Sequence, residues 1–391
     1  MHPDWKYLPK HILDSILQKL KLPSDHLRFS VVCKSWHCVA NHSRIQRAKM
    51  MSSCHHPPML LIPSDKEDTW NLYNVMKNIV LDLQVTVPSN YRRFCGSSKG
   101  WLIAMDENFV IALINPFLRV KGREKENSII HLPPLVPPMD IARYIWHKNY
   151  EEFLTNATIS ADPILCADDC IVVVTYMPLC QSAFIRLNKD TTWTYIGERI
   201  RGSYGMIQEV VYVEDKFYAV DLWSKLLSFD ITNQFNSNVK VAASGFEISG
   251  PYFDSYLVYT NEKELLMVQR FIDFQGDKCD KRKTKKFRVF GLDFDKFEWI
   301  EKNTLGGITL FLGDNSSTAV LASKIPGCKP DRIYFNHDND PINNRVNPRD
   351  FGVYNFKTQK FRLPYNTRAK NLLKTCKRYQ YPIWILPTFQ L

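Results

Sequence analysis

The sequence has no apolar run long enough to cross a membrane as a helix. No stretch of its 391 residues approaches the ~18 consecutive apolar residues of a spanning segment. Asp4, Lys6, Lys10 and Asp14 interrupt the apolar run that a secretory signal peptide requires near its start. We therefore expect no membrane partner, and we expect the protein in the nucleus, the cytoplasm or both.

The cysteines lack the regular spacing of a disulfide framework. There are 10 of them, scattered along the chain, which is typical of reduced thiols. Two groups could in principle bind a metal, Cys54-His55-His56 and the Cys166/Cys170 pair, but neither has a second ligand pair at zinc-like spacing. We expect no metal site.

Motifs of the common enzyme classes are absent as well. The sequence has no G-x-S-x-G elbow, no P-loop, no H-E-x-x-H and no G-x-G-x-x-G. The adjacent carboxylates Asp168 and Asp169 lie in a polar stretch that is more typical of a solvated turn than of an acid/base pair. We expect no catalytic residue, no cofactor-binding residue and no cofactor.

What is present is the composition of an ordinary folded protein. Hydrophobic residues make up 45% and charged residues 23%, so the chain can build a core. Aromatic residues reach 13%, which favours β-structure. The length suits one small module followed by one large domain. Lys and Arg exceed Asp and Glu by 51 − 40 = 11, which permits an acidic partner or nucleic acid.

The first 40 residues predict a short helical unit. Apolar residues recur at one-, three- and four-residue steps from Ile12 to Leu20, which indicates one apolar helix face after Leu8-Pro9. Ser24 is a suitable N-cap for a second helix, and a third stretch has an apolar side that includes Val32 and Trp36. A unit this small rarely sustains its own core. Its surface should therefore cover a partner or, alternatively, cap the rest of the chain.

This segment resembles an F-box of the plant type, through Trp5, Leu8-Pro9, the helix face, and the run from Leu27 to Trp36. It departs from the pattern at His11, usually acidic, and at His37, usually Arg. The resemblance implies docking on a Skp-type adaptor and, through it, on cullin and RING subunits of a ubiquitin ligase. The implied adaptor-binding residues are Leu8, Pro9, Ile12, Leu13, Ile16, Leu17, Leu20, Leu27, Val31 and Trp36.

Beyond residue 57 the sequence reads as short strands separated by polar turns. A strand–turn–strand pattern occurs six times, beginning at Asn71, Phe109, Ala183, Lys225, Phe287 and Phe351. With the strands between them, each unit holds about four strands, which is the arrangement of a propeller blade. We predict six blades, with five to seven compatible, closed by pairing of residues 382–389 with the first blade. Segments 273–286 and 337–349 would be rim loops. A generic multi-sheet protein or two sandwiches is the alternative.

This second part resembles the KIB-type domain that follows F-boxes in a large plant family. The resemblance rests on Asn115-Pro116, Leu132-Pro133, the segment 213–221 and the segment 384–389. It implies no catalytic motif. The predicted fold is therefore α+β and multidomain: an all-α F-box at residues 1–45, a linker at 46–57 and an all-β propeller at 58–391.

One basic run stands out between residues 278 and 288. It contains a pattern typical of a nuclear-localisation signal or an acidic-partner patch, formed by Lys281, Arg282, Lys283, Lys285 and Lys286. The plainer interpretation, which we favour, is a solvated hairpin loop.

The sequence as a whole predicts a non-catalytic substrate receptor of an SCF-type ligase, whose propeller binds an unidentified target protein. A basic nuclear or nucleic-acid-associated scaffold is the alternative, although we do not expect nucleic acid as a partner. A propeller enzyme or glycan binder is a third option, without a convergent set of carboxylates to support it.

Overall fold

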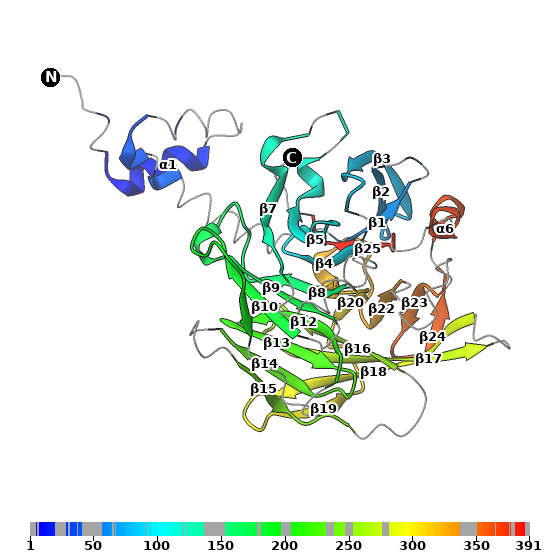
Figure 1. The fold of residues 1–391 in the computed structure, drawn as a ribbon. Helices are drawn as coiled ribbons and strands as arrows, with labels where there is room; N and C mark the ends of the chain where they lie inside the picture. Colours follow the sequence, from blue (N-terminus) through cyan, green and yellow to red (C-terminus); the bar gives the residue numbers. More distant parts are fainter. Residues whose placement is uncertain are drawn as a thin grey trace. The chain divides into compact units, whose positions relative to one another are not determined.

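The computed structural model of the chain divides into two compact units. The helices of the first 40 residues belong to one unit and six β-sheets belong to the other (Figure 1). The structure describes residues 5, 8–19, 29, 32–36, 38–40, 57–64, 66, 68–91, 93–119, 121–122, 124–136, 153–177, 181–196, 205–231, 238–246, 253–275, 281–336, 350–363, 365–374, 376 and 380–387.

The helical unit is built around α1 (Lys10–Lys19). The helix begins directly after Leu8-Pro9, and the carbonyl of Pro9 accepts hydrogen bonds from the N–H groups of Ile12 and Leu13 at 3.0 and 3.2 Å. Pro suits this position because its own N–H would have no partner in a first turn. The second helix predicted from Ser24 lies outside the described residues, and so does most of the predicted linker.

The first three sheets of the second unit each have four strands. Sheet 1 contains β25 (Ile383–Ile385), β1 (Met59–Pro63), β2 (Thr69–Asn74) and β3 (Ile79–Thr86), in that order. Sheet 2 contains β4 (Phe94–Ser98), β5 (Trp101–Met105), β6 (Val110–Ile114) and β7 (Ile129–Pro134). Sheet 3 contains β8 (Leu154–Ile159), β9 (Ile171–Tyr176), β10 (Gln181–Arg186) and β11 (Thr194–Ile196).

The other three sheets continue the pattern. Sheet 4 contains β12 (Ile207–Val213), β13 (Lys216–Asp221), β14 (Leu226–Asp230) and β15 (Asn238–Ala243). Sheet 5 contains β16 (Phe253–Tyr259), β17 (Leu265–Gln275), β18 (Lys281–Asp293) and β19 (Glu298–Lys302). Sheet 6 has five strands in the order β21 (Thr318–Leu321), β20 (Ile308–Leu312), β22 (Arg332–Phe335), β23 (Gly352–Asn355) and β24 (Lys360–Arg362).

The predicted six-bladed propeller is confirmed. Each of the six strand–turn–strand patterns in the sequence falls on a different sheet, and four of them contain two paired strands. The patterns from Phe109 and Lys225 contain one described strand each, β6 and β14, and the predicted second strand after β6 is wrong because Pro116–Leu118 form a 3-10 helix. The turns repeat too. Asn74 and Asp293 each accept hydrogen bonds from the N–H groups two and three residues later, and the next residues, Asn78 and Phe297, take left-handed φ angles of 55° and 52°. Asn and Asp favour such turns because their short side chains mimic a backbone acceptor.

The ring closes through the last strand, as the sequence predicted. β25 pairs antiparallel with β1, placing Trp384 opposite Leu60. The first strands of successive sheets contact one another, from β25 to β4, β8, β12, β16 and then β21. The first sheet is therefore completed by residues more than 300 positions away in the chain.

A single turn between β20 and β21 ties these inner strands together. The carbonyl of Asn315 accepts from the N–H of Ser97 on β4 at 2.9 Å, and its side-chain amide donates to the carbonyl of Thr155 on β8 at 2.8 Å. Two residues on, the hydroxyl of Ser317 donates to the carboxylate of Glu209 on β12 at 2.9 Å. One turn thus satisfies polar groups on three other blades, which helps fix the ring.

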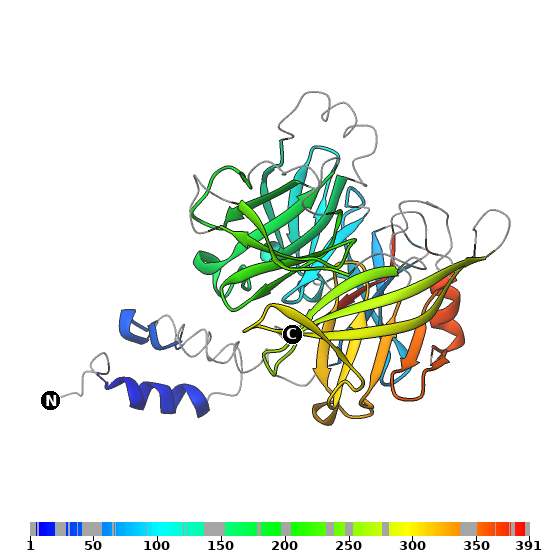
Figure 2. The same cartoon turned by 90° about the horizontal axis from the view of Figure 1, so that it is seen from below.

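Two features differ from the sequence prediction. Residues 273–275 and 281–286 are not loop: they continue strands β17 and β18, which pair from Leu266 and Gly291 out to Gln275 and Lys281 (Figure 2). The residues form strands because Ile272 and Thr284, which face each other, are both buried, so part of this hairpin is covered. The other predicted rim loop, 337–349, lies outside the described residues.

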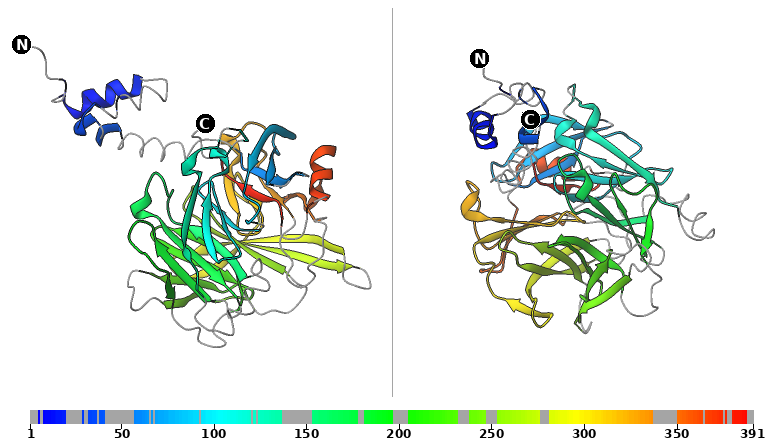
Figure 3. Two further views of the ribbon diagram at one scale, coloured as in Figure 1. Left: turned by 45° about the horizontal axis from the view of Figure 1, so that its top comes forward. Right: turned by 90° about the vertical axis from the view of Figure 1, so that its left-hand side faces the viewer.

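The second difference is a helix that the sequence analysis did not predict, α6 (Thr367–Lys374). Asn366 caps it, because its side-chain oxygen accepts from the N–H of Ala369 at 2.8 Å. Ala369 and Leu373 are fully buried and pack with Tyr73 and other residues of sheet 1. The helix, drawn in red, lies beside the blue strands of that sheet (Figure 3). The helix is therefore fixed on that sheet through its apolar side.

Candidate functional site

The helical unit has a small apolar core of its own. Leu13 and Leu17 of α1 are each 1% exposed and pack with Phe29, Val39 and, at its edge, Ala40. Leu13 and Leu17 are four residues apart, so they lie on one side of the helix. This core is assembled from residues far enough apart in sequence to hold the unit's helices together.

Trp36 connects this core to the start of the unit. Its ring centre lies 4.4 Å from that of Phe29, and its indole N–H donates to the carbonyl of Trp5 at 3.0 Å. Because the indole N–H already has an acceptor, the exposed part of the ring offers only apolar surface. Trp36 therefore supports the shape of the unit whether or not a partner covers it.

The same unit leaves other apolar side chains uncovered. Ile12 is 39% exposed and Val32 is 54% exposed, and Trp5 is 61% exposed. Pro9 is exposed as well, one turn before Ile12. We refer to Trp5, Pro9, Ile12 and Val32 as the open apolar surface. Such a concentration in so small a unit is typical of an interaction site.

The structure separates the predicted adaptor-binding residues into groups. Pro9 and Ile12 are exposed, Leu8, Ile16 and Trp36 are partly buried against the core, and Leu13 and Leu17 are inside it. The remaining three lie outside the described residues: Leu20, Leu27 and Val31. The helical period predicted that Ile12 and Leu13 share one apolar face of α1. In the structure Leu13 is buried within the unit and Ile12 is exposed.

The basic run in sheet 5 is partly occupied by contacts within the chain. The Arg282 side chain is 6% exposed, and its guanidinium lies 2.5 Å from the carboxylate of Asp254. The ammonium of Lys285 lies 3.0 Å from Asp273. Lys283 and Lys286 are exposed, and the ammonium of Lys286 lies 4.7 Å from the ring centre of Phe271. The side chain of Lys281 lies outside the description. The run is therefore an interrupted patch on a paired strand, not the solvated loop that we favoured.

A buried charge cluster lies beside it. Arg270 is fully buried, and its guanidinium contacts the carboxylate of Asp350 at 3.0 Å and the hydroxyl of Tyr256 at 3.2 Å. Burial by itself raises the pKa of Asp350, but the charge of Arg270 and the N–H of Thr284 outweigh it and hold that pKa below its usual value. The cluster is fully bonded, so we assign it a structural role.

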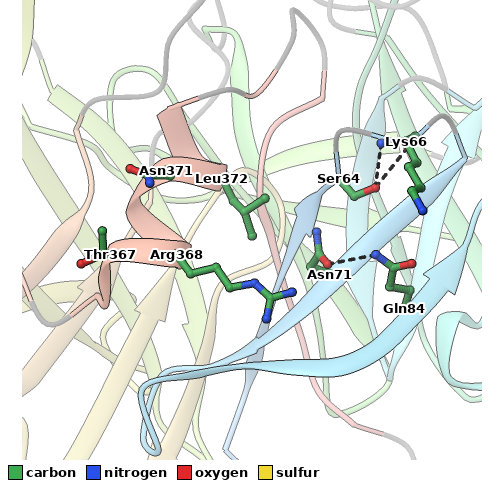
Figure 4. Close-up of a pocket in the computed structure, with 8 residues that line it drawn as sticks. All are labelled: Ser64, Lys66, Asn71, Gln84, Thr367, Arg368, Asn371 and Leu372. Atoms are coloured by element: carbon green, nitrogen blue, oxygen red, sulfur yellow. Dashed lines mark hydrogen bonds between the residues drawn. The ribbon is translucent and has the colours of Figure 1, made fainter.

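A cavity lined by described residues lies beside α6 (Figure 4). It has a volume of about 560 Å³ and lies between that helix and the strands of sheet 1. Its polar lining includes Asn71 and Gln84 from β2 and β3, and Arg368 and Asn371 from α6. The sequence analysis missed this site, although Asn366 and the spacing of Ala369 and Leu373 could have indicated the helix that forms one wall.

Among the described residues, no group of three or more His, Cys, Asp or Glu side chains could hold a metal ion. Of the two groups considered from the sequence, Cys54-His55-His56 lies outside the description. In the other, the thiol of Cys170 is buried and donates to the carbonyl of Ala161 at 3.3 Å. Within the described part of the chain, no helix is long and apolar enough to span a membrane.

Comparison with known families agrees with this architecture. Residues 72–355 match the KIB1-4 beta-propeller family, and residues 5–47 match the F-box-like domain. The chain belongs to the KIB1-4 beta-propeller family. This KIB1-4 propeller chain is similar over nearly its whole length to F-box proteins of Arabidopsis thaliana. The predicted resemblances to an F-box and to a KIB-type domain are both confirmed.

Two relatives illustrate the extent of the match. The KIB1-4 propeller chain is 22% identical to F-box protein At2g17036, covering 92% of this chain and 90% of that protein. It is 23% identical to F-box protein SKIP23, covering 92% and 91% respectively. Among solved structures, a functionally unknown protein from Desulfotomaculum acetoxidans aligns with 78% of this chain and 94% of its own, at 9% identity and a TM-score of 0.39.

The residues that carried the KIB resemblance have structural tasks in the propeller. The side chain of Asn115, 1% exposed, accepts from the N–H of Phe117 at 3.1 Å and so caps the short 3-10 helix Pro116–Leu118. The carbonyl of Pro133 accepts from the indole N–H of Trp193, the residue before β11 of sheet 3, at 2.7 Å. Trp384 lies in the closing strand. These family features therefore describe how blades are built and joined, and they do not identify a binding site.

Proposed function

We propose that this protein is the substrate-recognition subunit of an SCF-type cullin–RING ubiquitin ligase, without catalytic chemistry of its own. In this proposal the open apolar surface docks on a Skp-type adaptor, which links the chain to cullin and RING subunits. The propeller then holds a target protein. The observation that carries the proposal is the helical unit itself: its core is already closed by Leu13 and Leu17, and yet Ile12 and Val32 are left exposed.

Apolar side chains left in water carry a free-energy cost that a docked partner removes. Covering an exposed apolar side chain contributes roughly 25 cal/mol per Å² of apolar surface removed from water. The F-box-like match over residues 5–47 indicates what class of partner would cover it. A partner that buries Ile12 and Val32 gains this free energy without opening the unit, because neither residue belongs to its core.

The proposed gain in ubiquitination rate comes from proximity. Holding a target on a tethered receptor raises its effective concentration near the conjugating enzyme, with no reacting group needed on the receptor. A propeller suits this task because the sheets are fixed in a closed ring while the loops that join strands can vary. The ring closure by β25 supplies that rigidity here.

The test is direct binding of the purified full-length chain to a purified Skp-type adaptor. The test variant is Ile12→Asp with Val32→Asp, which places two charges on the open apolar surface. We expect the association constant to fall at least 100-fold, since each change replaces a buried apolar contact by a buried charge. Unchanged affinity in the double variant would contradict the proposed docking surface.

The matched control is His11→Asp, which places one charge of the same sign on the helix that carries Ile12, about 100° around its axis from that residue. We expect full binding in the control, because an acidic side chain in the first turn also favours the helix dipole. A circular-dichroism melt of each variant separates loss of docking from loss of folding. If the double variant is partly unfolded and the control is folded, adaptor binding is measured with Val32→Asp alone.

A further inference from the structure

The cavity beside α6 has the chemistry of a binding site. We propose that it binds a phosphate monoester group, carried by a phosphorylated protein segment or by a free small molecule. Its volume of about 560 Å³ is within the range of small-ligand sites and exceeds the size of a single phosphate. The bound molecule therefore brings atoms beyond the phosphate into the cavity. This inference does not rest on the ligase proposal, since it concerns the other unit of the chain.

The sheet side of the cavity is polar where apolar residues would be expected. Asn71 is 4% exposed and lies on the same side of β2 as Tyr73, which belongs to an apolar cluster. It faces Gln84 directly across the ladder, and the two amides share one long hydrogen bond of 3.4 Å from Gln84 to Asn71. No described residue accepts a hydrogen bond from the NH₂ group of Asn71. Its NH₂ group is therefore available to donate hydrogen bonds to a ligand in the cavity.

Cationic side chains reach the cavity from two elements. Arg368 extends from α6 toward Asn71, and Lys66 lies on the other side, near Ser64 and Gln84 (Figure 4). Arg368 also interacts elsewhere in the chain, so the proposal does not require it to be free. It lies in the first turn of the helix, where the dipole adds positive potential. The two cations therefore face a shared space from opposite walls.

The walls are fixed, which lets the donors keep their positions. Ala369 and Leu373 anchor α6 to sheet 1, and Asn366 both caps the helix and donates its side-chain amide to the carbonyl of Asn78 at 2.7 Å. Pre-positioned donors bind an oxyanion more tightly because little ordering is required on binding. The helix and the strand pair thus form a rigid, donor-rich cleft.

The lining selects among ligand classes. Among the described residues it includes two cations, three carboxamides and two hydroxyl groups, with no acidic and no aromatic side chain. Without an aromatic face there is no stacking platform for a nucleobase. A phosphate monoester carries between −1.5 and −2 charges near neutral pH and three acceptor oxygens, which matches a donor-rich, cationic cleft. Asp68 lies in the same turn as Lys66 and does not line the cavity.

The experiment is calorimetric titration of the full-length chain with inorganic phosphate, O-phosphoserine, and a phosphoserine peptide with its unphosphorylated twin. We expect phosphate-dependent binding that weakens with salt. Arg368→Gln and Lys66→Gln should each raise the dissociation constant about 10-fold, the scale of a lost charge-assisted hydrogen bond. Both residues are exposed, so the variants should fold. Lys374→Gln, on the same helix but outside the cavity, should bind as the wild type does.

The arms of the titration distinguish the source of the phosphate. Tight binding of the phosphopeptide with weak binding of O-phosphoserine indicates a protein segment, and similar binding of both indicates a small molecule. Either result supports the site if Arg368→Gln and Lys66→Gln weaken it. Absence of binding by all phosphorylated probes, or binding that both variants leave unchanged, would overturn the proposal. Neither result bears on adaptor docking, which is measured separately on the helical unit.

Discussion

Trp384 donates its indole N–H to the carbonyl of Leu312 at 2.9 Å. Its backbone pairs with Leu60 in sheet 1, while Leu312 belongs to β20 in sheet 6. Its ring also lies 5.1 Å from that of Phe311, in an edge-to-face arrangement. One residue of a three-residue strand therefore joins the first blade to the last.

Replacing this residue should destabilise the whole propeller. Trp384 is 1% exposed, and removing a buried aromatic side chain costs about 3–5 kcal/mol through lost burial and the cavity left behind. We expect Trp384→Ala to lower the free energy of unfolding by that amount in urea denaturation. Leu386→Ala, two residues on and 37% exposed, is the control and should cost less than about 1 kcal/mol. Equal, small effects of both changes would show that β25 is not needed for closure.

The buried pair of Arg270 and Asp350 predicts a loss of stability in acid. Burial raises the pKa of Asp350, whereas the charge of Arg270 and the hydrogen bonds from Thr284 lower it. The lowering effects are the larger, so the pKa of Asp350 is below its usual value. A carboxylate with a lowered folded pKa stabilises the fold above its unfolded pKa of about 3.9, and that stabilisation disappears as pH falls through the folded value. We expect the free energy of unfolding to decline below about pH 4.

Asp350→Asn isolates this contribution. It leaves the fully buried Arg270 without its charge partner, so we expect a loss of about 3–5 kcal/mol at neutral pH. The acid decline of the variant should also be shallower than that of the wild type. Asp273→Asn is the control, since its ion pair with Lys285 is solvent-exposed and contributes little. A variant with an unchanged acid slope would mean that another carboxyl group dominates the pH dependence.

The basic run of β18 is predicted not to act as a nuclear-localisation signal. Its backbone is paired with β17, and Arg282 is held by Asp254, so the run cannot be read as an extended peptide without breaking the hairpin. We expect Lys283→Ala, Lys285→Ala and Lys286→Ala together to leave the nuclear fraction of a fluorescent fusion protein unchanged in cells. Loss of the nuclear signal in this triple variant would support the alternative of a nuclear scaffold.

The parts that the sequence predicted correctly are those set by local patterns. Four outer strand pairs follow from the apolar residues of short strands and from turns that begin with residues such as Asn74 and Asp293. The closing strand around Trp384 was predictable because it is a short apolar segment at the end of a repeating array.

The remaining features depend on contacts between distant residues. Thr284 and Asp350 bury the hairpin of β17 and β18, although they are 66 positions apart, so a charged segment became strand instead of loop. The division of the F-box helix into buried Leu13 and exposed Ile12 depends on where Phe29 and Val39 pack. The cavity needs α6 to lie on sheet 1, across nearly the length of the chain. Helical or strand period alone carries none of this information.

The most direct test of the central claim is recovery of ligase subunits with the intact protein. Tagged wild-type chain and the Ile12→Asp, Val32→Asp double variant would be purified from plant cell extract, with His11→Asp alongside, and bound proteins quantified by mass spectrometry. We predict that the wild type and His11→Asp recover a Skp-type adaptor together with cullin and RING subunits, and that the double variant loses all three. Equal recovery with the double variant, or no recovery with any of the chains, would contradict the account.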